Sequence, residues 1–259
     1  YTGHVKYDGY NDYRGGGHFS GRITAPLTFA GAIAKQILAK EGIVIGAHAL
    51  SVAGIMDFPF DPLGEEPDLF EKLSSMRLPV IDGEQGAAME EAILAAQKEG
   101  DSVGGQIECM ALGLPVGMGE PFFDSLESEM AHMAFSIPAV KSISFGDGET
   151  LAGMRGSEAN DPMRYENGKV KTITNHNGGV LGGISNGNPL RFTVTIKPTA
   201  SIGKRQETVD ISKKEDTMLS IGGRHDPCIV TRAIPVVENA AAFVLLDLLL
   251  TGRRYHYGR

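Results

Sequence analysis

The spacing of apolar residues predicts two amphipathic helices early in the chain. Residues 26–40 place apolar side chains on one face at helical intervals, with Thr24 suited to cap the helix and Gly42 suited to end it. Residues 86–98 repeat this pattern and stop before Gly100, a residue type that commonly follows a helix.

Two further helices are predicted later in the chain. Asp124 and Glu127 have the spacing of a capping box, which predicts a helix over residues 125–135 with Asp124 as its cap. Residues 236–250 follow Pro235 and are apolar nearly all round. A helix of that composition must be buried on several sides, in the centre of the fold or against another subunit.

Shorter apolar runs predict strands at residues 43–48, 103–112, 141–145 and 192–196. The last run is the clearest, because its apolar residues alternate with threonines until Lys197. Residues 57–80 are expected to make a surface excursion with a helical turn at residues 69–74. Residues 146–181 read as a long irregular loop, of the kind that is functional or mobile. The mixture of helices and strands predicts an α/β (α+β) fold.

Composition narrows the classes of protein to which the chain can belong. It has 259 residues, of which 42% are hydrophobic and 22% charged, and its net charge is −8. An acidic balance argues against non-specific nucleic-acid binding, which relies on a basic face. The longest apolar run is interrupted by Asp247 and is too short to span a bilayer. Cys109 and Cys228 have no close spacing, so we expect a reduced, cytoplasmic protein.

Three segments supply the residue types that hold a flat, phosphorylated cofactor. They are residues 175–183, 197–201 and 223–228. Paired glycines in the first segment let a backbone approach a ligand closely, because no Cβ blocks it. Lys197, Thr199 and Ser201 offer a cation and hydroxyl donors to phosphate. Arg224 and Asp226 combine an anion clamp with a possible proton acceptor.

At these segments the chain resembles chorismate synthase. The resemblance continues through residues 13–22, 31–35, 98–105, 117–124 and 136–141. Several family motifs that follow one another in the same order over most of a chain are far more specific than one glycine-rich motif. The match is weakest over residues 57–80.

The resemblance implies a fold, a reaction and a cofactor. The fold is a single domain over residues 1–259, with helices sandwiched between two antiparallel β-sheets, in a homotetramer. The reaction is the trans-1,4 elimination of phosphate from 5-enolpyruvylshikimate 3-phosphate, a small anionic substrate, to give chorismate in the shikimate pathway. It requires reduced flavin mononucleotide (FMN), with NADPH or an external reductase as the electron source. The alternative is a catalytically dead flavin-binding fragment of the same fold.

The resemblance also assigns roles to particular residues. Asp226 and Ser20 would act in catalysis, and Arg22 and Arg224 would bind the substrate. The residues implied in cofactor binding are His18, Phe19, Ser20, Pro138, Ala139, Gly182, Lys197, Pro198, Thr199, Ala200, Ser201 and Arg224. No metal site is expected, because no pair of histidines has metal-ligand spacing.

The chain also departs from the family in places. His18 and Phe19 stand where the family has Arg and Ser, and His18 can still donate one hydrogen bond. The family's chain begins roughly a hundred residues earlier, in a part that holds two reaction histidines. This chain is therefore expected to be either part of a longer protein or a fragment that lacks both histidines. Ser185 lies in a G-x-S-x-G sequence, but no helix pattern follows it. We therefore interpret it as a loop and not as the nucleophile of a serine hydrolase.

Overall fold

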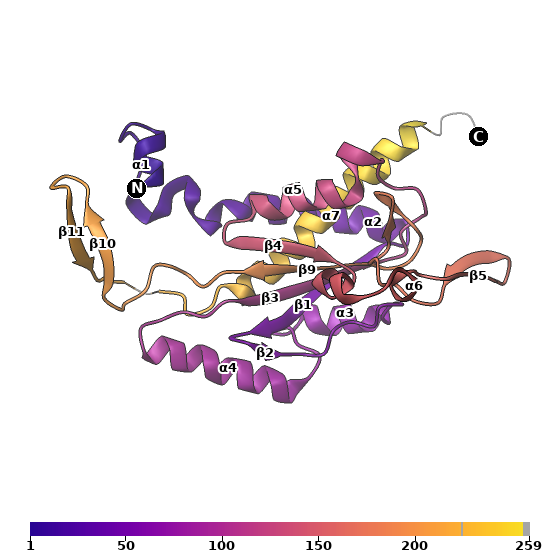
Figure 1. Cartoon of the computed structure of the whole chain (residues 1–259), viewed down its shortest axis with the longest axis horizontal. Helices are drawn as coiled ribbons and strands as arrows, with labels where there is room; N and C mark the ends of the chain where they lie inside the picture. The colour runs from indigo at the N-terminus through magenta and orange to yellow at the C-terminus, as the bar shows by residue number, and fades with distance from the viewer. Residues whose placement is uncertain (224, 256–259) are drawn as a thin grey trace.

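A five-stranded antiparallel sheet is the central element of the computed structural model, which describes residues 1–223 and 225–255 (Figure 1). Its strand order is β2-β1-β3-β9-β4. The strands are β1 (Val44–Val52), β2 (Ile55–Met56), β3 (Gly105–Leu112), β4 (Val140–Phe145) and β9 (Leu190–Ile196). All four predicted strands are confirmed, and β1 continues past its predicted end to Val52.

Alternation along the strands gives the sheet two different faces, because successive side chains point to opposite sides. Ala47, Cys109 and Phe192 are aligned across β1, β3 and β9, and all three belong to the main hydrophobic core. His48 and Glu108 are paired on the opposite face, where both are buried. The apolar face therefore builds the core, while the other face encloses charged groups.

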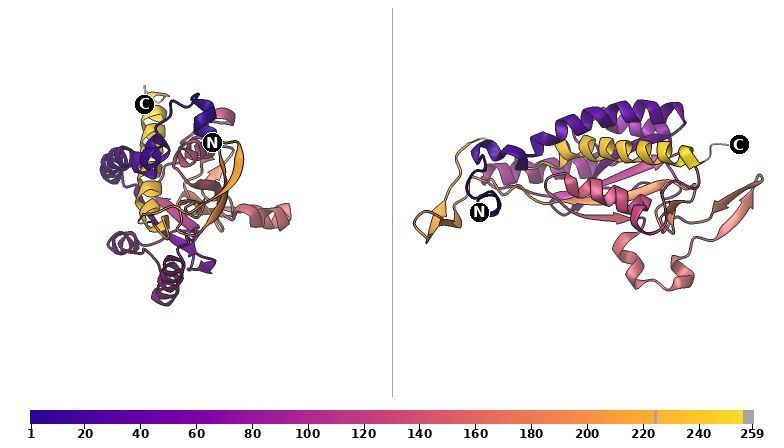
Figure 2. Two further views of the ribbon diagram at one scale, coloured as in Figure 1. Left: turned by 90° about the vertical axis from the view of Figure 1, so that its left-hand side faces the viewer. Right: turned by 90° about the horizontal axis from the view of Figure 1, so that it is seen from above.

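The helices α2 (Thr24–Lys40) and α7 (Val230–Tyr255) lie side by side against the sheet, with their N-termini at the same end of the molecule (Figure 2). They meet closely at Gly31, where a Cβ atom would lie 2.1 Å from the carbonyl oxygen of Asn239. The helix α7 has an apolar stretch, Val230–Gly252, that is long enough to cross a membrane. However, 61% of this stretch is buried inside the protein. This burial is that of a core helix.

The remaining α-helices are α1 (Thr2–Lys6), α3 (Pro67–Ser74), α4 (Gly83–Lys98), α5 (Leu126–Ser136) and α6 (Gly156–Ala159). The helices α3 and α4 contact β1, whereas α5 contacts β4 and α7. Short 3₁₀ turns are η1 (Arg14–Phe19), η2 (Gly21–Ile23), η3 (Phe122–Asp124) and η4 (Gly148–Gly153). The helical turn predicted at residues 69–74 is confirmed as part of α3.

Three two-stranded hairpins complete the described part of the chain. They pair β5 (Met163–Glu166) with β6 (Lys169–Thr172), β7 (Val180–Leu181) with β8 (Ile184–Ser185), and β10 (Gln206–Asp210) with β11 (Glu215–Leu219). The β5–β6 and β10–β11 hairpins project from opposite ends of the molecule (Figures 1 and 2). The prediction of one irregular loop over residues 146–181 is therefore wrong, because two of its segments pair locally as strands.

The predicted start of the last helix is also wrong. The helix α7 begins at Val230 and contains Pro235, which was expected to precede it. Val230 is fully buried and Ile234 is 3% exposed. Burial of the first turn stabilises helical backbone there, although the proline removes one hydrogen bond from the helix interior.

The structure also corrects the predicted N-terminal caps of α5 and α2. The side chain of Ser125, and not that of Asp124, caps α5 by accepting a hydrogen bond from the Ser128 amide at 3.0 Å. Thr24 is the first residue of α2, and its hydroxyl donates to the Gly21 carbonyl at 2.7 Å. Despite these shifts the α+β class is confirmed, with helices packed on antiparallel sheets.

Candidate functional site

Several of the predicted site segments meet at one end of the central sheet. Ile196 ends β9 and pairs with Val140 of β4 on one side and with Gly105 of β3 on the other. The residues just beyond these positions must therefore lie together. The amide of Lys197 donates to the carbonyl of Ala139 at 3.0 Å, which joins two of the segments implied in cofactor binding.

The segment before β3 joins this group to the start of α7. The hydroxyl of Ser102 donates to the carbonyl of Thr199 at 2.7 Å. The amide of the next residue, Val103, donates to the carbonyl of Pro227 at 2.8 Å. Asp226 is thereby placed beside the Lys197–Thr199 segment, although the two are far apart in the sequence.

One carboxylate oxygen of Asp226 accepts a hydrogen bond, and the other does not. Its Oδ1 accepts from the Cys228 amide at 3.2 Å. Its Oδ2 lies 3.1 Å from Nη1 of Arg232, within ion-pair distance, but it is a buried atom without a hydrogen-bond partner. The Arg232 side chain is 80% exposed, so solvent screens this contact and it is a weak surface ion pair.

Thr199 contains a second buried polar atom without a partner, its Oγ1. Buried polar atoms in proteins are nearly always hydrogen-bonded, so two exceptions on adjoining segments indicate a place where a polar ligand binds. Lys197 is exposed and makes no ion pair with any described residue, so its ammonium is free to meet an anion.

The backbone at Ala139, which contacts Lys197, is strained. Its φ is 75°, in the left-handed region that residues other than glycine seldom enter. Ala139 and its neighbour Pro138 are both partly exposed. Strained backbone of this kind is concentrated at ligand sites, where the surrounding structure holds it in place.

The predicted residues near the N-terminus lie just before α2. The Oγ of Ser20 accepts from the Arg22 amide at 3.2 Å, and Nη1 of Arg22 donates to the Gly15 carbonyl at 3.1 Å. His18 and Phe19 are exposed and pack with the ring of Tyr7. The structure therefore gives His18 and Phe19 local contacts with the N-terminal segment.

The local electrostatics suit an anion, although the whole chain is acidic. The N-termini of α2 and α7 lie at this end of the molecule, and each carries partial positive charge. Lys197 and Arg22 add two cationic side chains in segments that adjoin them. Arg224, the other predicted cation, lies outside the described residues.

Gly182 is not brought together with the other predicted residues. It lies in the turn between β7 and β8, and its neighbour Gly183 accepts a hydrogen bond from the Leu126 amide. The preceding Gly179 packs against Leu190, which begins β9, whereas the other candidates lie beyond the opposite end of that strand. The role of Gly182 stays a prediction.

Ser185 has none of the features of a hydrolase nucleophile. It is 1% exposed, its hydroxyl donates to the Pro115 carbonyl at 2.6 Å, and it accepts from the Met118 amide at 2.9 Å. It lies in the two-residue strand β8, with no helix directly after it. The buried hydroxyl with two hydrogen bonds fits a structural role, and the interpretation as a loop is corrected because Ser185 lies in β8.

A buried charged cluster under the sheet was missed by the sequence reasoning. Nδ1 of His48 lies 3.1 Å from Asp57, and its Nε2 lies 3.0 Å from Glu108. Burial lowers the pKa of His48, but the hydrogen bonds to the two carboxylates outweigh burial and raise the pKa above its ordinary value. A signal existed, since His48 and Glu108 are titratable residues within strands that are mostly apolar.

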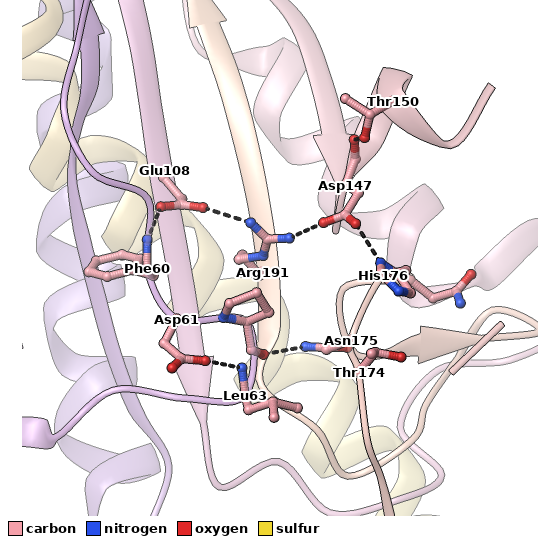
Figure 3. A network of polar contacts seen from close by, with 12 residues as sticks. Phe60, Asp61, Leu63, Glu108, Asp147, Thr150, Thr174, Asn175, His176 and Arg191 are labelled. Carbon is pink, nitrogen blue, oxygen red and sulfur yellow. Dashed lines mark hydrogen bonds and ion pairs between the residues drawn. The ribbon is translucent and has the colours of Figure 1, made fainter. Parts of the chain in front are cut away.

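This cluster continues into residues 146–181, the segment that was expected to be an irregular loop, functional or mobile. Arg191 contacts Glu108 at 3.3 Å and Asp147 at 2.6 Å, and Asp147 contacts Nδ1 of His176 at 2.6 Å (Figure 3). Asp147 and His176 both belong to residues 146–181. The base of that segment is therefore tied to the sheet. Within residues 1–223 and 225–255, no group of three or more His, Cys, Asp and Glu side chains is arranged to hold a metal ion.

Comparisons with known proteins agree on one family. The family model of chorismate synthase matches residues 1–250. A chorismate synthase of Korarchaeum cryptofilum is 44% identical over 254 residues, which are 98% of this chain and 69% of that protein. One of Dehalococcoides mccartyi is 46% identical over 250 residues, which are 96% of this chain and 68% of that protein.

A solved structure supports the same assignment. It is a crystal structure of chorismate synthase, with a TM-score of 0.79 and 26% sequence identity, and the match covers 96% of this chain and 69% of that one. The match to the family model extends from the N-terminal segment with Ser20 into α7, and so includes every segment of the site described above. The chain therefore belongs to the chorismate synthase family, the lyases that form chorismate in aromatic amino acid biosynthesis.

Proposed function

We propose that this chain eliminates phosphate from 5-enolpyruvylshikimate 3-phosphate at the end of the sheet where residues 138–139, 197–201 and 226 meet. The family requires a reduced flavin, and we propose that the flavin here is FMN. The observation that carries this placement is the pair of buried polar atoms without hydrogen-bond partners, Thr199 Oγ1 and Asp226 Oδ2. They lie on two segments that Ser102 and Val103 join.

The residues present fit a flavin with a phosphate group. Lys197 and the hydroxyl of Thr199 would hold the phosphate, and the backbone at Pro138 and Ala139 would lie against the ring system. When bound, the reduced flavin supplies an electron transiently as phosphate leaves. Overall the reaction is redox-neutral: a carbon–oxygen bond to phosphate breaks, a ring proton is lost, and a second ring double bond forms.

The residues of this chain would then bind anions and move a proton. Arg22, Arg224 and the helix N-termini offset the charges of the substrate and of the departing phosphate. Asp226 accepts or relays the ring proton, because its Oδ2 is not engaged in a hydrogen bond. Ser20 donates a hydrogen bond near the reacting groups.

The proposal also covers the assembly and the supply of electrons. We propose a homotetramer in the cytoplasm, with NADPH or an external reductase as the source of electrons. Phe29 is 71% exposed on α2, and Phe243 is 42% exposed on α7. Exposed aromatic side chains on neighbouring helices support contact with further protein there. The alternative of a catalytically dead fragment finds no support among the relatives, which are named as chorismate synthases.

The variant Asp226→Asn tests the placement of the reaction. We expect turnover to fall by about 10²–10⁴-fold, because the amide cannot accept the proton, while flavin binding is retained. Steady-state formation of chorismate and a flavin titration measure the two effects. Asp216→Asn, on the exposed strand β11, is the matched control. Near-normal turnover of Asp226→Asn would refute the proposed role.

A further inference from the structure

The loop between α4 and β3, residues 99–104, has no role in the site as the resemblance describes it. Its sequence, Glu-Gly-Asp-Ser-Val-Gly, was singled out only because it resembles the family. In the structure it lies between the two segments that the proposed function brings together. The loop contacts both of them through its own hydrogen bonds.

These contacts connect the loop to two distant parts of the chain. The hydroxyl of Ser102 donates to the Thr199 carbonyl at 2.7 Å, across 97 positions of sequence. The amide of Val103 donates to the Pro227 carbonyl at 2.8 Å. The dipeptide Ser102–Val103 therefore contacts both Thr199 and Pro227, the residue that follows Asp226.

A second set of contacts joins the start of the loop to residues 203–204. The carbonyl of Gly100 accepts from the amides of Gly203 and Lys204, at 2.9 and 3.2 Å. The ammonium of Lys204 also lies 2.7 Å from the carboxylate of Asp101. The loop thus contacts residues 199–204 at both ends, so the segment is held by more than one bond.

The two glycines after Val103 allow this close approach. A Cβ atom on Gly104 would lie 2.5 Å from the Ile196 carbonyl oxygen and 3.0 Å from the Pro198 nitrogen. A Cβ atom on Gly105 would lie 2.0 Å from the Ser51 carbonyl oxygen. A larger residue at Gly104 would push the loop away from residues 196–198 and lengthen the Ser102 hydrogen bond, whereas one at Gly105 would meet β1.

We propose that Ser102 is a positioning residue for the flavin-binding segment. Its hydroxyl fixes the Thr199 backbone, and so directs the unpartnered Oγ1 of Thr199 toward the ligand. Through Val103 the same loop sets the distance between Thr199 and Asp226. The inference rests on the proposed function, because it takes residues 197–201 as the cofactor segment.

Three variants test this inference in the full chain. Ser102→Ala removes the donor, and Ser102→Thr keeps a hydroxyl that can restore the bond. Ser75→Ala is the matched control, because the Ser75 hydroxyl also donates to a backbone carbonyl at 2.7 Å, that of Lys72. The readouts are the dissociation constant for FMN and amide hydrogen exchange at residues 197–204 and 226–228.

We expect Ser102→Ala to weaken FMN binding by about three- to tenfold, the effect of one neutral hydrogen bond, and to speed amide exchange in both segments. Ser102→Thr should recover most of the affinity, and Ser75→Ala should change neither readout. FMN affinity and exchange in Ser102→Ala that match the unmodified chain would overturn the inference. If the unmodified chain fails to bind FMN, the proposed function fails, and the exchange rates alone decide the role of Ser102.

Discussion

Ala139 is the residue at which backbone strain and the proposed site coincide. Its φ of 75° places a methyl group in a conformation that favours glycine, and its carbonyl accepts the hydrogen bond from Lys197. Alanine occupies this position despite the cost. We therefore regard the strain as part of how the start of β4 is presented to the ligand.

The strain at Ala139 predicts an unusual response to glycine. Ala139→Gly should be neutral or stabilise the protein by up to about 1 kcal/mol, because relief of the left-handed strain offsets the greater freedom of glycine in the unfolded chain. Ala95→Gly, at an exposed position of the regular helix α4, should lose about 1 kcal/mol. Urea denaturation measures both. An equal loss in the two variants would show that Ala139 is not strained.

His48 gives the stability of the protein a defined dependence on pH. Its pKa is raised above the ordinary value of 6.5, because both ring nitrogens contact carboxylates. A raised pKa means that the folded state binds the proton more tightly than the unfolded state. The resulting stabilisation is complete below pH 6.5 and is lost as the pH rises through the folded pKa.

The variant His48→Gln isolates this contribution. It should reduce the free energy of unfolding by about 3–5 kcal/mol just below pH 6.5, because Asp57 is left as a buried carboxylate without a cation and Glu108 keeps only Arg191. The difference from the unmodified protein should shrink as the pH rises above 6.5. Denaturant unfolding at a series of pH values measures it. A difference that stays constant with pH would mean that the pKa of His48 is the same in the folded and unfolded states.

At the scale of elements, periodicity predicted the strands and the long helices well, but it did not predict their ends. The helix α7 extends past Pro235 because burial of Val230 and Ile234 favours helical backbone there, and burial cannot be read from one sequence. The β5–β6 hairpin could have been found. Asn167 and Gly168 at its turn, both with positive φ, are a sequence typical of tight hairpins.

The sequence predicted which types of residue form the site, but not the contacts that bring them together. Lys197, Thr199 and Asp226 were chosen by their chemistry and by resemblance, and the structure brings their segments together. Ser102 was missed because its contact depends on the loop lying against β9, and no local pattern shows that. Gly182 was chosen in the same way as the others, and the chain places it toward the opposite end of β9.

The contact between α2 and α7 yields a prediction about packing. Gly31→Ala should lower the free energy of unfolding by about 1–3 kcal/mol or more, because the new methyl group would lie 2.1 Å from the Asn239 carbonyl oxygen. Gly83→Ala, at the start of α4, meets no atom within 4 Å and should be neutral or slightly stabilising. Thermal unfolding distinguishes the two. A tolerated Gly31→Ala would show that the helices are free to move apart.

At the scale of the whole molecule, the assigned end of an acidic protein contains cationic groups. The net charge is −8, yet Lys197, Arg22 and the N-termini of α2 and α7 lie at or beside the end of the sheet that we assign to the ligands. Such a local field can attract an anionic substrate in spite of the overall charge. The elements α2, α7, β3, β4 and β9 support this arrangement, since each has one end there.

The most direct test of the account is a titration of the chain with FMN, followed by flavin fluorescence, with and without 5-enolpyruvylshikimate 3-phosphate. If residues 197–201 and 226 form one site, FMN fluorescence should be quenched, and the dissociation constant should fall when the substrate is present. No quenching under either condition would contradict the account, because the segments that meet at the end of β9 would then not form a flavin site.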